Sequence, residues 1–200
     1  MNKESNFNPK DLLKPVNMLN LYAQGAFPMA DENGEISWYQ PKERSVIFMD
    51  DYNIPRSLQK FITVADFEFR FDENIIEVIK NCANRETTWI SEELIEAYRK
   101  LAKLGYLHSV EVFQKNNLIG GLYGIAIGGA FFGESMFSKI SQASKSALAT
   151  LIKHLEEKEY IFLDVQFATE HLKMFGTKEI DFEEFNNLLD KAYLKEISFI

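Results

Sequence analysis

The feature that most constrains the fold of this chain is a glycine-rich apolar run at residues 118–137, LIGGLYGIAIGGAFFGESMF. Six of the ten glycines in the sequence lie within it, between Gly120 and Gly133. So many glycines disfavour a helix, and the uncharged part of the run, Leu118–Phe132, is shorter than the roughly 20 residues that a membrane-spanning helix needs. Glycine in a strand lets another backbone or a ligand approach closely. The run therefore predicts one or two buried strands that lie against another element or a ligand.

Two acidic residues interrupt apolar sequence in this region. Glu134 ends the glycine-rich run, and Asp164 lies inside a second apolar run at residues 161–166. A carboxylate beside apolar side chains costs free energy unless it is paired or faces a ligand. Gln166 follows Asp164 by two positions, so on a strand both side chains leave the same face. The pair is suited to orienting a nucleophile or transferring a proton, and more often such a pair is a structural hydrogen bond.

The rest of the sequence predicts a mixed α/β fold. Alternating apolar residues predict strands at 45–49, 62–70, 107–114 and 160–167, in addition to the glycine-rich run. Apolar stripes predict helices at 10–24, interrupted by Pro15, at 72–82 after Asp72, at 91–105 after Ser91, from Ser138 or Ser141, and from Asp181 onward. Helices and strands that alternate in this way favour a mixed α/β or α+β sheet. We expect a small N-terminal lobe at residues 1–60 and a catalytic domain at 61–200, with a soft boundary because no linker marks it.

Composition and motifs exclude several classes of protein. The net charge of −8 argues against a general nucleic-acid binder, although it allows a local basic patch. The single cysteine fits a reducing compartment, and the first eleven residues lack the apolar segment of a signal peptide, so we expect a soluble cytoplasmic protein without membrane attachment. Nucleotide-binding glycine motifs and clusters of metal ligands are absent from the sequence, which predicts no cofactor and no metal. Lys139 and Lys145 lie near a predicted helix start, where they could form an anion site. A solvated helix end explains them at least as well.

Taken together, these motifs strongly resemble the leucyl/phenylalanyl-tRNA–protein transferases of bacteria. The resemblance covers most of the chain and is most specific in the block Gly120–Ser138 and in Asp164-Val165-Gln166. It is carried further by the following segments: Tyr22–Pro28, Trp38 with Pro41 and Arg44, Asn81–Ala83 with Arg85, Thr88–Ile90, Ala97-Tyr98, His108–Glu111, Ala143–Lys145, and His171-Leu172 with Gly176. The sequence departs from the family pattern at Met29, where a Trp is usual, and at Met174-Phe175, where Ser-Leu is usual.

This resemblance implies a catalytic lobe similar to the GNAT acetyltransferases, and it implies a reaction. Leu, Phe or Met is moved from aminoacyl-tRNA to a protein whose N-terminal residue is Arg or Lys, which marks that protein for degradation by the N-end rule. It implies a monomer. It also implies that no cofactor is needed, because an aminoacyl ester is already activated. Asp164 and Gln166 would be the catalytic pair that deprotonates or orients the incoming α-amino group.

The resemblance also implies the remaining site residues. Glu134 would lie in the aminoacyl-adenosine site. The donor side chain would contact Leu122, Phe131, Met136, Leu148, Leu151 and Leu163, and the terminal adenosine would contact Tyr22, Phe27 and Trp89. Contacts to the tRNA would come from Lys42, Arg44, Lys139, Lys145 and Lys153.

Two other functions suit the same sequence. The first is an acyl-CoA-dependent N-acetyltransferase on the same fold, against which residues 137–145 lack the glycine of a pyrophosphate loop. The second is a non-catalytic adaptor that binds basic N-termini through acids such as Glu134 and Asp164.

Overall fold

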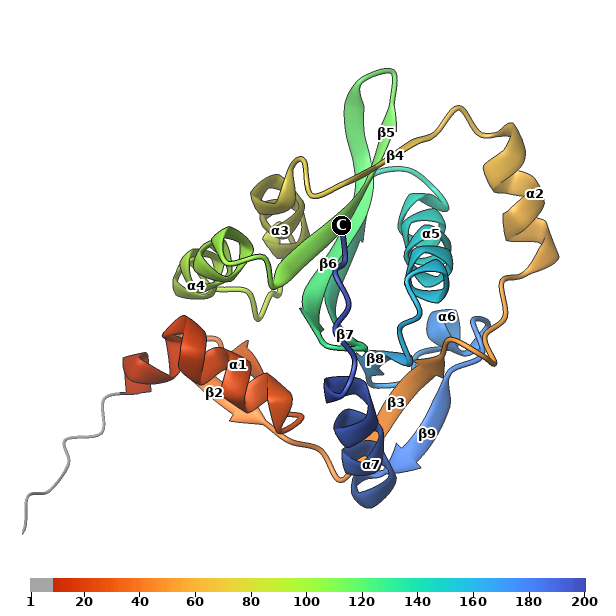
Figure 1. Ribbon diagram of the computed structural model, residues 1–200. Coiled ribbons are helices and arrows are strands. Elements are labelled where there is room, and N and C mark those ends of the chain that lie inside the picture. The colour runs from red at the N-terminus through yellow and green to blue at the C-terminus, as the bar shows by residue number, and fades with distance from the viewer. Residues whose placement is uncertain (1–8) are drawn as a thin grey trace, which may run out of the picture.

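A seven-stranded mixed sheet organises the computed structural model, which describes residues 9–200 (Figure 1). Its strands run in the order β4-β5-β6-β7-β8-β3-β9. Their bounds are β3 Glu43–Phe48, β4 Glu68–Phe71, β5 Leu107–Gln114, β6 Asn117–Ile127, β7 Ala130–Ser138, β8 Phe162–Gln166 and β9 Lys178–Asp181. All neighbouring strands are antiparallel except β7 and β8, which are parallel. The predicted mixed α/β fold is confirmed.

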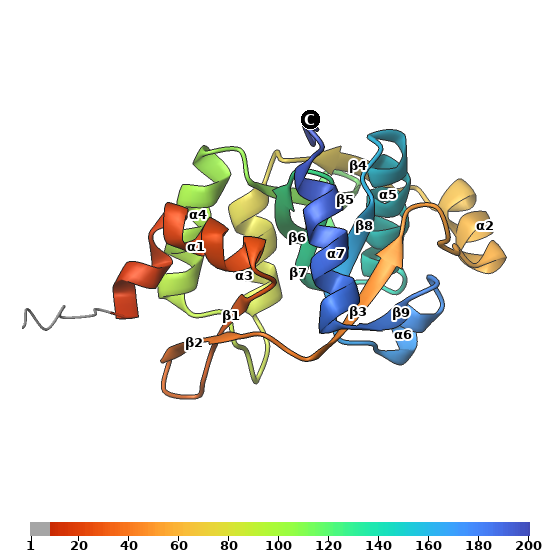
Figure 2. The ribbon, with the colours of Figure 1, turned by 60° about the horizontal axis from the view of Figure 1, so that its bottom comes forward.

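Helices cover both faces of the sheet (Figures 1 and 2). On one face α3 (Ile75–Ala83), α4 (Glu92–Lys103) and α7 (Phe182–Tyr193) pack against the strands, and on the other lies α5 (Ala143–Glu157) with α2 (Arg56–Val64) outside it. A short helix, α6 (Glu170–Lys173), follows β8. The two faces carry two separate apolar cores, and this burial on both sides explains why the central strands read as almost continuous apolar runs.

The segment before β3 has a small sheet of its own, and its buried side chains join one of the two apolar cores. A 3-10 helix, η1 (Pro9–Leu13), and α1 (Pro15–Ala23) precede a hairpin of β1 (Phe27–Ala30) and β2 (Ile36–Tyr39), whose strands pair only with each other. The break at Pro15 and the stop at Gly25, which has a φ of +80°, confirm the predicted interrupted helix. Strand β3 already belongs to the large sheet, and the division of the chain near residue 60 stays a prediction. The prediction that the first eleven residues are not a signal peptide falls mostly outside the described residues.

Three local predictions were wrong. Residues 62–70 are not one strand, because α2 continues to Val64 and β4 begins only at Glu68. The alternation at Phe67 and Phe69 does not extend back to Ile62. Asp72 does not cap α3, which begins after Asn74; instead its carboxylate accepts a hydrogen bond from the Ser109 backbone N–H at 2.7 Å. Helix α5 begins at Ala143, later than predicted, because Gln142 adopts a φ of +70°.

Glycine is required where the sheet is most tightly packed. A β-carbon on Gly124 would lie 2.3 Å from the Phe132 carbonyl oxygen, at a bulge between β6 and β7. One on Gly120 would lie 2.6 Å from the β-carbon of Ala143, so this glycine lets α5 approach the sheet. The predicted role of the glycine-rich run in close packing is confirmed. Among residues 9–200, the helices are all too short or too polar to cross a membrane.

Candidate active site

An apolar cavity opens where β7 and β8 separate. The two strands pair only from Ala130 with Phe162 to Phe132 with Asp164, and beyond these pairs they part. The space between them is a cavity of about 100 Å³. It is lined by Leu122, Tyr123, Gly133, Glu134, Ser135, Met136, Leu148, Leu151, Leu163, Val165 and Leu172. The glycine-rich run therefore supplies one wall, and the strand with Asp164 supplies the opposite wall.

Most of the residues expected to hold the donor side chain surround this one cavity. They are Leu122, Met136, Leu148, Leu151 and Leu163. Phe131 does not line it: its ring is fully buried and packs against Phe199, with centroids 5.4 Å apart. Val165 and Leu172 complete the apolar wall and were missed, although Val165 stands between the two predicted catalytic residues and could have been found from that position.

Glu134 is the acidic group of the cavity. Its Oε1 accepts a hydrogen bond from the Tyr22 hydroxyl at 2.9 Å, and its Oε2 accepts one from Tyr98 at 2.8 Å. Burial raises the pKa of the Glu134 carboxyl to about 7, although both tyrosine hydroxyls favour its ionised form. Burial and the nearby Glu134 carboxylate raise the pKa of Tyr22 and Tyr98, so both hydroxyls keep their protons. Glu134 is therefore a carboxyl group that can gain or lose a proton near neutral pH.

Asp164 has a very different environment, because it forms a buried ion pair with Arg44. The Arg44 Nη2 lies 2.6 Å from Asp164 Oδ2, and its Nε lies 2.9 Å from both carboxylate oxygens. Both side chains are almost fully excluded from solvent, at 2% and 0% exposure. The guanidinium lies between the rings of Phe27 and Phe185, at 4.7 and 4.9 Å from their centroids, and its Nη1 donates to the Gly25 carbonyl at 2.8 Å. This arrangement fixes the Asp164 carboxylate and occupies its oxygens.

Gln166 connects the parted strands. Its backbone has a φ of +64°, and its N–H donates to Asp164 Oδ1 at 2.8 Å. Its side-chain Nε2 lies 3.3 Å from the Gly133 carbonyl oxygen and 3.4 Å from Glu134 Oε1. Asp164 thus holds the backbone of Gln166 in an unusual conformation, and that conformation directs the amide side chain toward Glu134.

The structure separates the aromatic residues expected to hold adenosine. Tyr22 and Phe27 are buried, at 0% and 1% exposure, so neither offers a free ring face. Trp89 is only half-buried, on the loop before α4. Two exposed aromatic residues whose rings contact Phe27, Tyr39 and Phe167, were missed. Phe167 directly follows Gln166 in the sequence, and that position was the signal that could have identified it.

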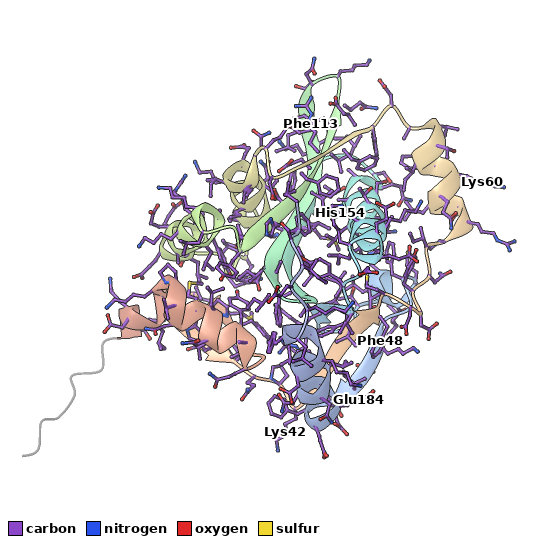
Figure 3. The ribbon with its side chains drawn as sticks, viewed as in Figure 1. Lys42, Phe48, Lys60, Phe113, His154 and Glu184 are labelled. Atoms are coloured by element: carbon purple, nitrogen blue, oxygen red, sulfur yellow. The ribbon has the colours of Figure 1, made fainter. Side chains whose placement is uncertain are left out.

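The predicted basic residues also separate into two groups. Lys42, Lys139 and Lys153 are exposed and Lys145 is half-buried, and Lys42 lies at the outer surface (Figure 3). Arg44 is buried in its ion pair and presents no surface to a nucleic acid. Arg85 was missed: it is exposed, and its Nη2 donates to Ser135 Oγ at 2.8 Å and to the Met136 carbonyl at 2.9 Å. Because both acceptors line the cavity, Arg85 places a positive charge at its rim.

One polar group of the cavity wall has no partner among the described residues. Within the described part of the chain, no three His, Cys, Asp or Glu side chains gather as a metal site would require. Tyr123 lines the cavity, and its hydroxyl is fully buried and has no hydrogen-bond partner among residues 9–200. A buried hydroxyl of this kind is expected to find a partner, and a polar atom of a ligand would supply one.

Known proteins resemble this chain over almost its whole length. The model of a family described as leucyl/phenylalanyl-tRNA protein transferase matches residues 46–190, and that of its N-terminal domain matches residues 11–42. A leucyl/phenylalanyl-tRNA–protein transferase of Sulfurimonas denitrificans is 44% identical over 93% of this chain and 83% of that protein. One of Akkermansia muciniphila is 46% identical over 91% of this chain and 97% of that protein.

A likeness to a solved structure is weaker. L-PGS from Bacillus licheniformis aligns with a TM-score of 0.44 and 12% identity, over 79% of this chain and 55% of that chain. A likeness of this size carries no argument about function.

Proposed function

Because the chain belongs to the leucyl/phenylalanyl-tRNA–protein transferase family, and is thus an aminoacyltransferase that uses tRNA, we propose its particular substrates and site. It transfers Leu, Phe or Met from aminoacyl-tRNA to the α-amino group of proteins that begin with Arg or Lys. In the cytoplasm, where charged tRNA is available, this transfer marks the acceptor for N-end rule degradation. The chain acts as a monomer through a GNAT-like lobe at residues 61–200, which follows a small lobe at residues 1–60. The observation that carries the proposal is the apolar cavity lined by Glu134, whose carboxylate lies 3.4 Å from the side-chain amide of Gln166.

The cavity supports an apolar donor residue. Its volume of about 100 Å³ and its walls of Leu, Met and Val side chains suit one medium-sized hydrophobic side chain, and a charged side chain would lose its hydration there without a partner. Selection among Leu, Phe and Met is weak in such a pocket, because one methylene group changes binding by only about 1–3 kcal/mol.

The donor ester lies at the mouth when its side chain fills the cavity. The acceptor nitrogen attacks the ester carbonyl carbon, a C–N bond forms, and the bond from the carbonyl carbon to the adenosine oxygen breaks. One proton passes from the nitrogen to the leaving oxygen. Holding the two reactants in place can lower the barrier by about 7–11 kcal/mol, so an already activated ester needs little further catalysis.

Asp164 and Glu134 have different roles in the proposed reaction. Asp164 would lose its ion pair with Arg44 if it took a proton, so we assign it a positioning role through the backbone of Gln166. Gln166 orients the incoming amine with its side-chain amide. Glu134 accepts the proton and returns it to the leaving oxygen, because its pKa of about 7 suits transfer in both directions near neutral pH.

The tRNA end lies on the side of the cavity that faces Arg85 and the loop with Trp89. Arg85 offers its guanidinium to a phosphate, and the half-buried Trp89 offers a ring face to the adenine. Lys139, Lys145, Lys42 and Lys153 are the further candidates for phosphate contacts. Tyr22 supports the adenosine site indirectly, through its hydrogen bond to Glu134.

A transfer assay tests this function. Purified protein, Phe-tRNA carrying labelled Phe, and a peptide that begins with Arg should yield labelled peptide, and a peptide that begins with Glu should yield none. Leu-tRNA and Met-tRNA measured in parallel give the donor preference. Absence of labelled peptide at any protein concentration would refute the proposal.

A further inference from the structure

We propose that the exposed rings of Tyr39 and Phe167, with the carboxylates of Glu43 and Glu179, receive the first residue of the acceptor polypeptide. We call these four residues the acceptor surface. The ligand is an N-terminal residue with a cationic side chain, Arg or Lys. The proposal rests on the proposed function, because it names the place where that reaction takes its second substrate.

The reaction itself fixes where the acceptor must lie. Its α-amino nitrogen has to reach the ester carbonyl beside Gln166, and Phe167 is the next residue of the chain. The Phe167 side chain is 53% exposed and that of Tyr39 is 45% exposed. Both rings contact the buried ring of Phe27, Phe167 edge-on at 5.9 Å and Tyr39 stacked at 6.3 Å between centroids. One buried ring therefore holds two exposed rings next to the residue that orients the amine.

Strand register places the backbones of two acidic residues near Gln166. Ser45 of β3 pairs with Gln166 on one side and with Glu179 of β9 on the other. Neighbouring strands lie about 4.8 Å apart, so the Cα atoms of Gln166 and Glu179 are about 10 Å apart. Because β3 and β8 are antiparallel, Glu43 lies beyond Ser45 in the direction in which Phe167 follows Gln166. Both carboxylates are exposed, and Figure 2 shows the β1–β2 hairpin and α6 at this end of the molecule with the start of β3 between them.

Aromatic rings beside carboxylates are the surroundings that a cationic side chain prefers. A guanidinium or ammonium group binds the face of an aromatic ring, and the carboxylates add attraction. The opposite rim of the cavity carries Arg85, which suits a phosphate and repels a cation. The Arg85 rim therefore favours the tRNA, and the acceptor surface, where two carboxylates outnumber the neighbouring Lys42, favours the basic N-terminus.

The test compares peptides in the transfer assay with Phe-tRNA. The acceptors begin with Arg, Lys or citrulline, the last being an uncharged residue of nearly the same shape as Arg. Phe167→Leu should raise the KM for the Arg peptide about 2- to 5-fold, and Tyr39→Leu with Phe167→Leu about 5- to 30-fold. The preference for Arg over citrulline should fall by a similar factor, the KM for Phe-tRNA should stay unchanged, and Phe167→Tyr should behave as wild type. Glu43→Gln with Glu179→Gln should also lower that preference.

Controls separate this proposal from general damage and from failure of the proposed function. Tyr106→Leu removes an aromatic residue of 38% exposure between α4 and β5 and should change neither KM. An unchanged peptide KM in the Tyr39/Phe167 double variant would overturn the acceptor surface, and a rise in the KM for Phe-tRNA alone would assign the rings to adenosine. If the wild type transfers nothing, the proposed function fails; calorimetry with the Arg peptide then still decides, because equal binding by wild type and double variant overturns the surface.

Discussion

Replacing Arg44 with Met tests whether the ion pair with Asp164 holds the site together. The side chains are 2% and 0% exposed, and three Arg44–Asp164 contacts lie between 2.6 and 2.9 Å. Removing one partner of a buried ion pair leaves a stranded charge, at a cost of about 3–5 kcal/mol. For a chain of this size, 1 kcal/mol corresponds to about 2–4 °C in melting temperature, so Arg44→Met should melt about 6–20 °C lower.

A double-mutant cycle makes the reasoning quantitative. Asp164→Leu alone strands the Arg44 charge, and the two single changes together would cost about 6–10 kcal/mol if they were independent. The double variant strands no charge; it leaves the Gly25 carbonyl and the Gln166 N–H without these partners, at about 1–3 kcal/mol each. It should therefore be more stable than the sum of the single effects predicts, by several kcal/mol.

Urea unfolding followed by circular dichroism measures all three variants. Lys42→Met is the matched control, because Lys42 is exposed and only two residues away, and its effect should stay within about 0.5 kcal/mol. Strict additivity in the cycle, or a loss below about 1 kcal/mol for Arg44→Met, would show that the pair does not stabilise the fold in this way.

Further changes have equally definite outcomes. The folded-state pKa of Glu134, about 7, lies above its unfolded value near 4.5, so its contribution to stability is full below pH 4.5 and is lost as pH rises to 7. In Glu134→Gln the melting temperature should therefore depend less on pH between 4.5 and 7. The transfer rate should fall below pH 7 as the Glu134 base becomes protonated, and an unchanged pH profile in Glu134→Gln would remove it from proton transfer. Leu122→Ala enlarges the cavity and should favour Phe over Leu as donor while lowering stability by about 2–5 kcal/mol, measured by paired transfer and unfolding. Gly124→Ala should fold poorly or not at all, since its β-carbon would meet the Phe132 carbonyl oxygen at 2.3 Å; native-like melting would contradict the bulge.

Local chemistry made much of the fold predictable. Ser91 caps α4 and Asp181 caps α7 as expected, because a hydroxyl or carboxylate that accepts from a first-turn N–H needs only its near neighbours. Alternation at Phe67 and Phe69 extends the predicted strand back to residue 62, whereas packing of α2 against α5 favours a helix there. Asp72 has the usual sequence of a helix cap, and its true partners, Ser109 and His108, come from a strand far along the chain.

The site divides in the same way. The family resemblance identified most of the cavity wall, whereas the alternation of apolar residues indicated only that these strands are buried. The family resemblance singled out Arg44 and Asp164 without indicating that they bind each other, since the pairing depends on β3 entering the sheet beside β8. Arg85 and Tyr123 reach the cavity only through the folded arrangement of several elements, and spacing in the sequence carries no record of it.

The place of β3 between β8 and β9 has a consequence for the synthesis of the chain. Arg44 and Asp164 are 120 positions apart, and a ribosome that adds about 5–20 residues per second needs about 6–24 s to connect them. Throughout this time Val46 and Ile47, both fully buried in the folded protein, have no strand to pair with. The β1–β2 hairpin can form early, but the half of the sheet that carries Gln166 has to assemble late, around a strand that was made first.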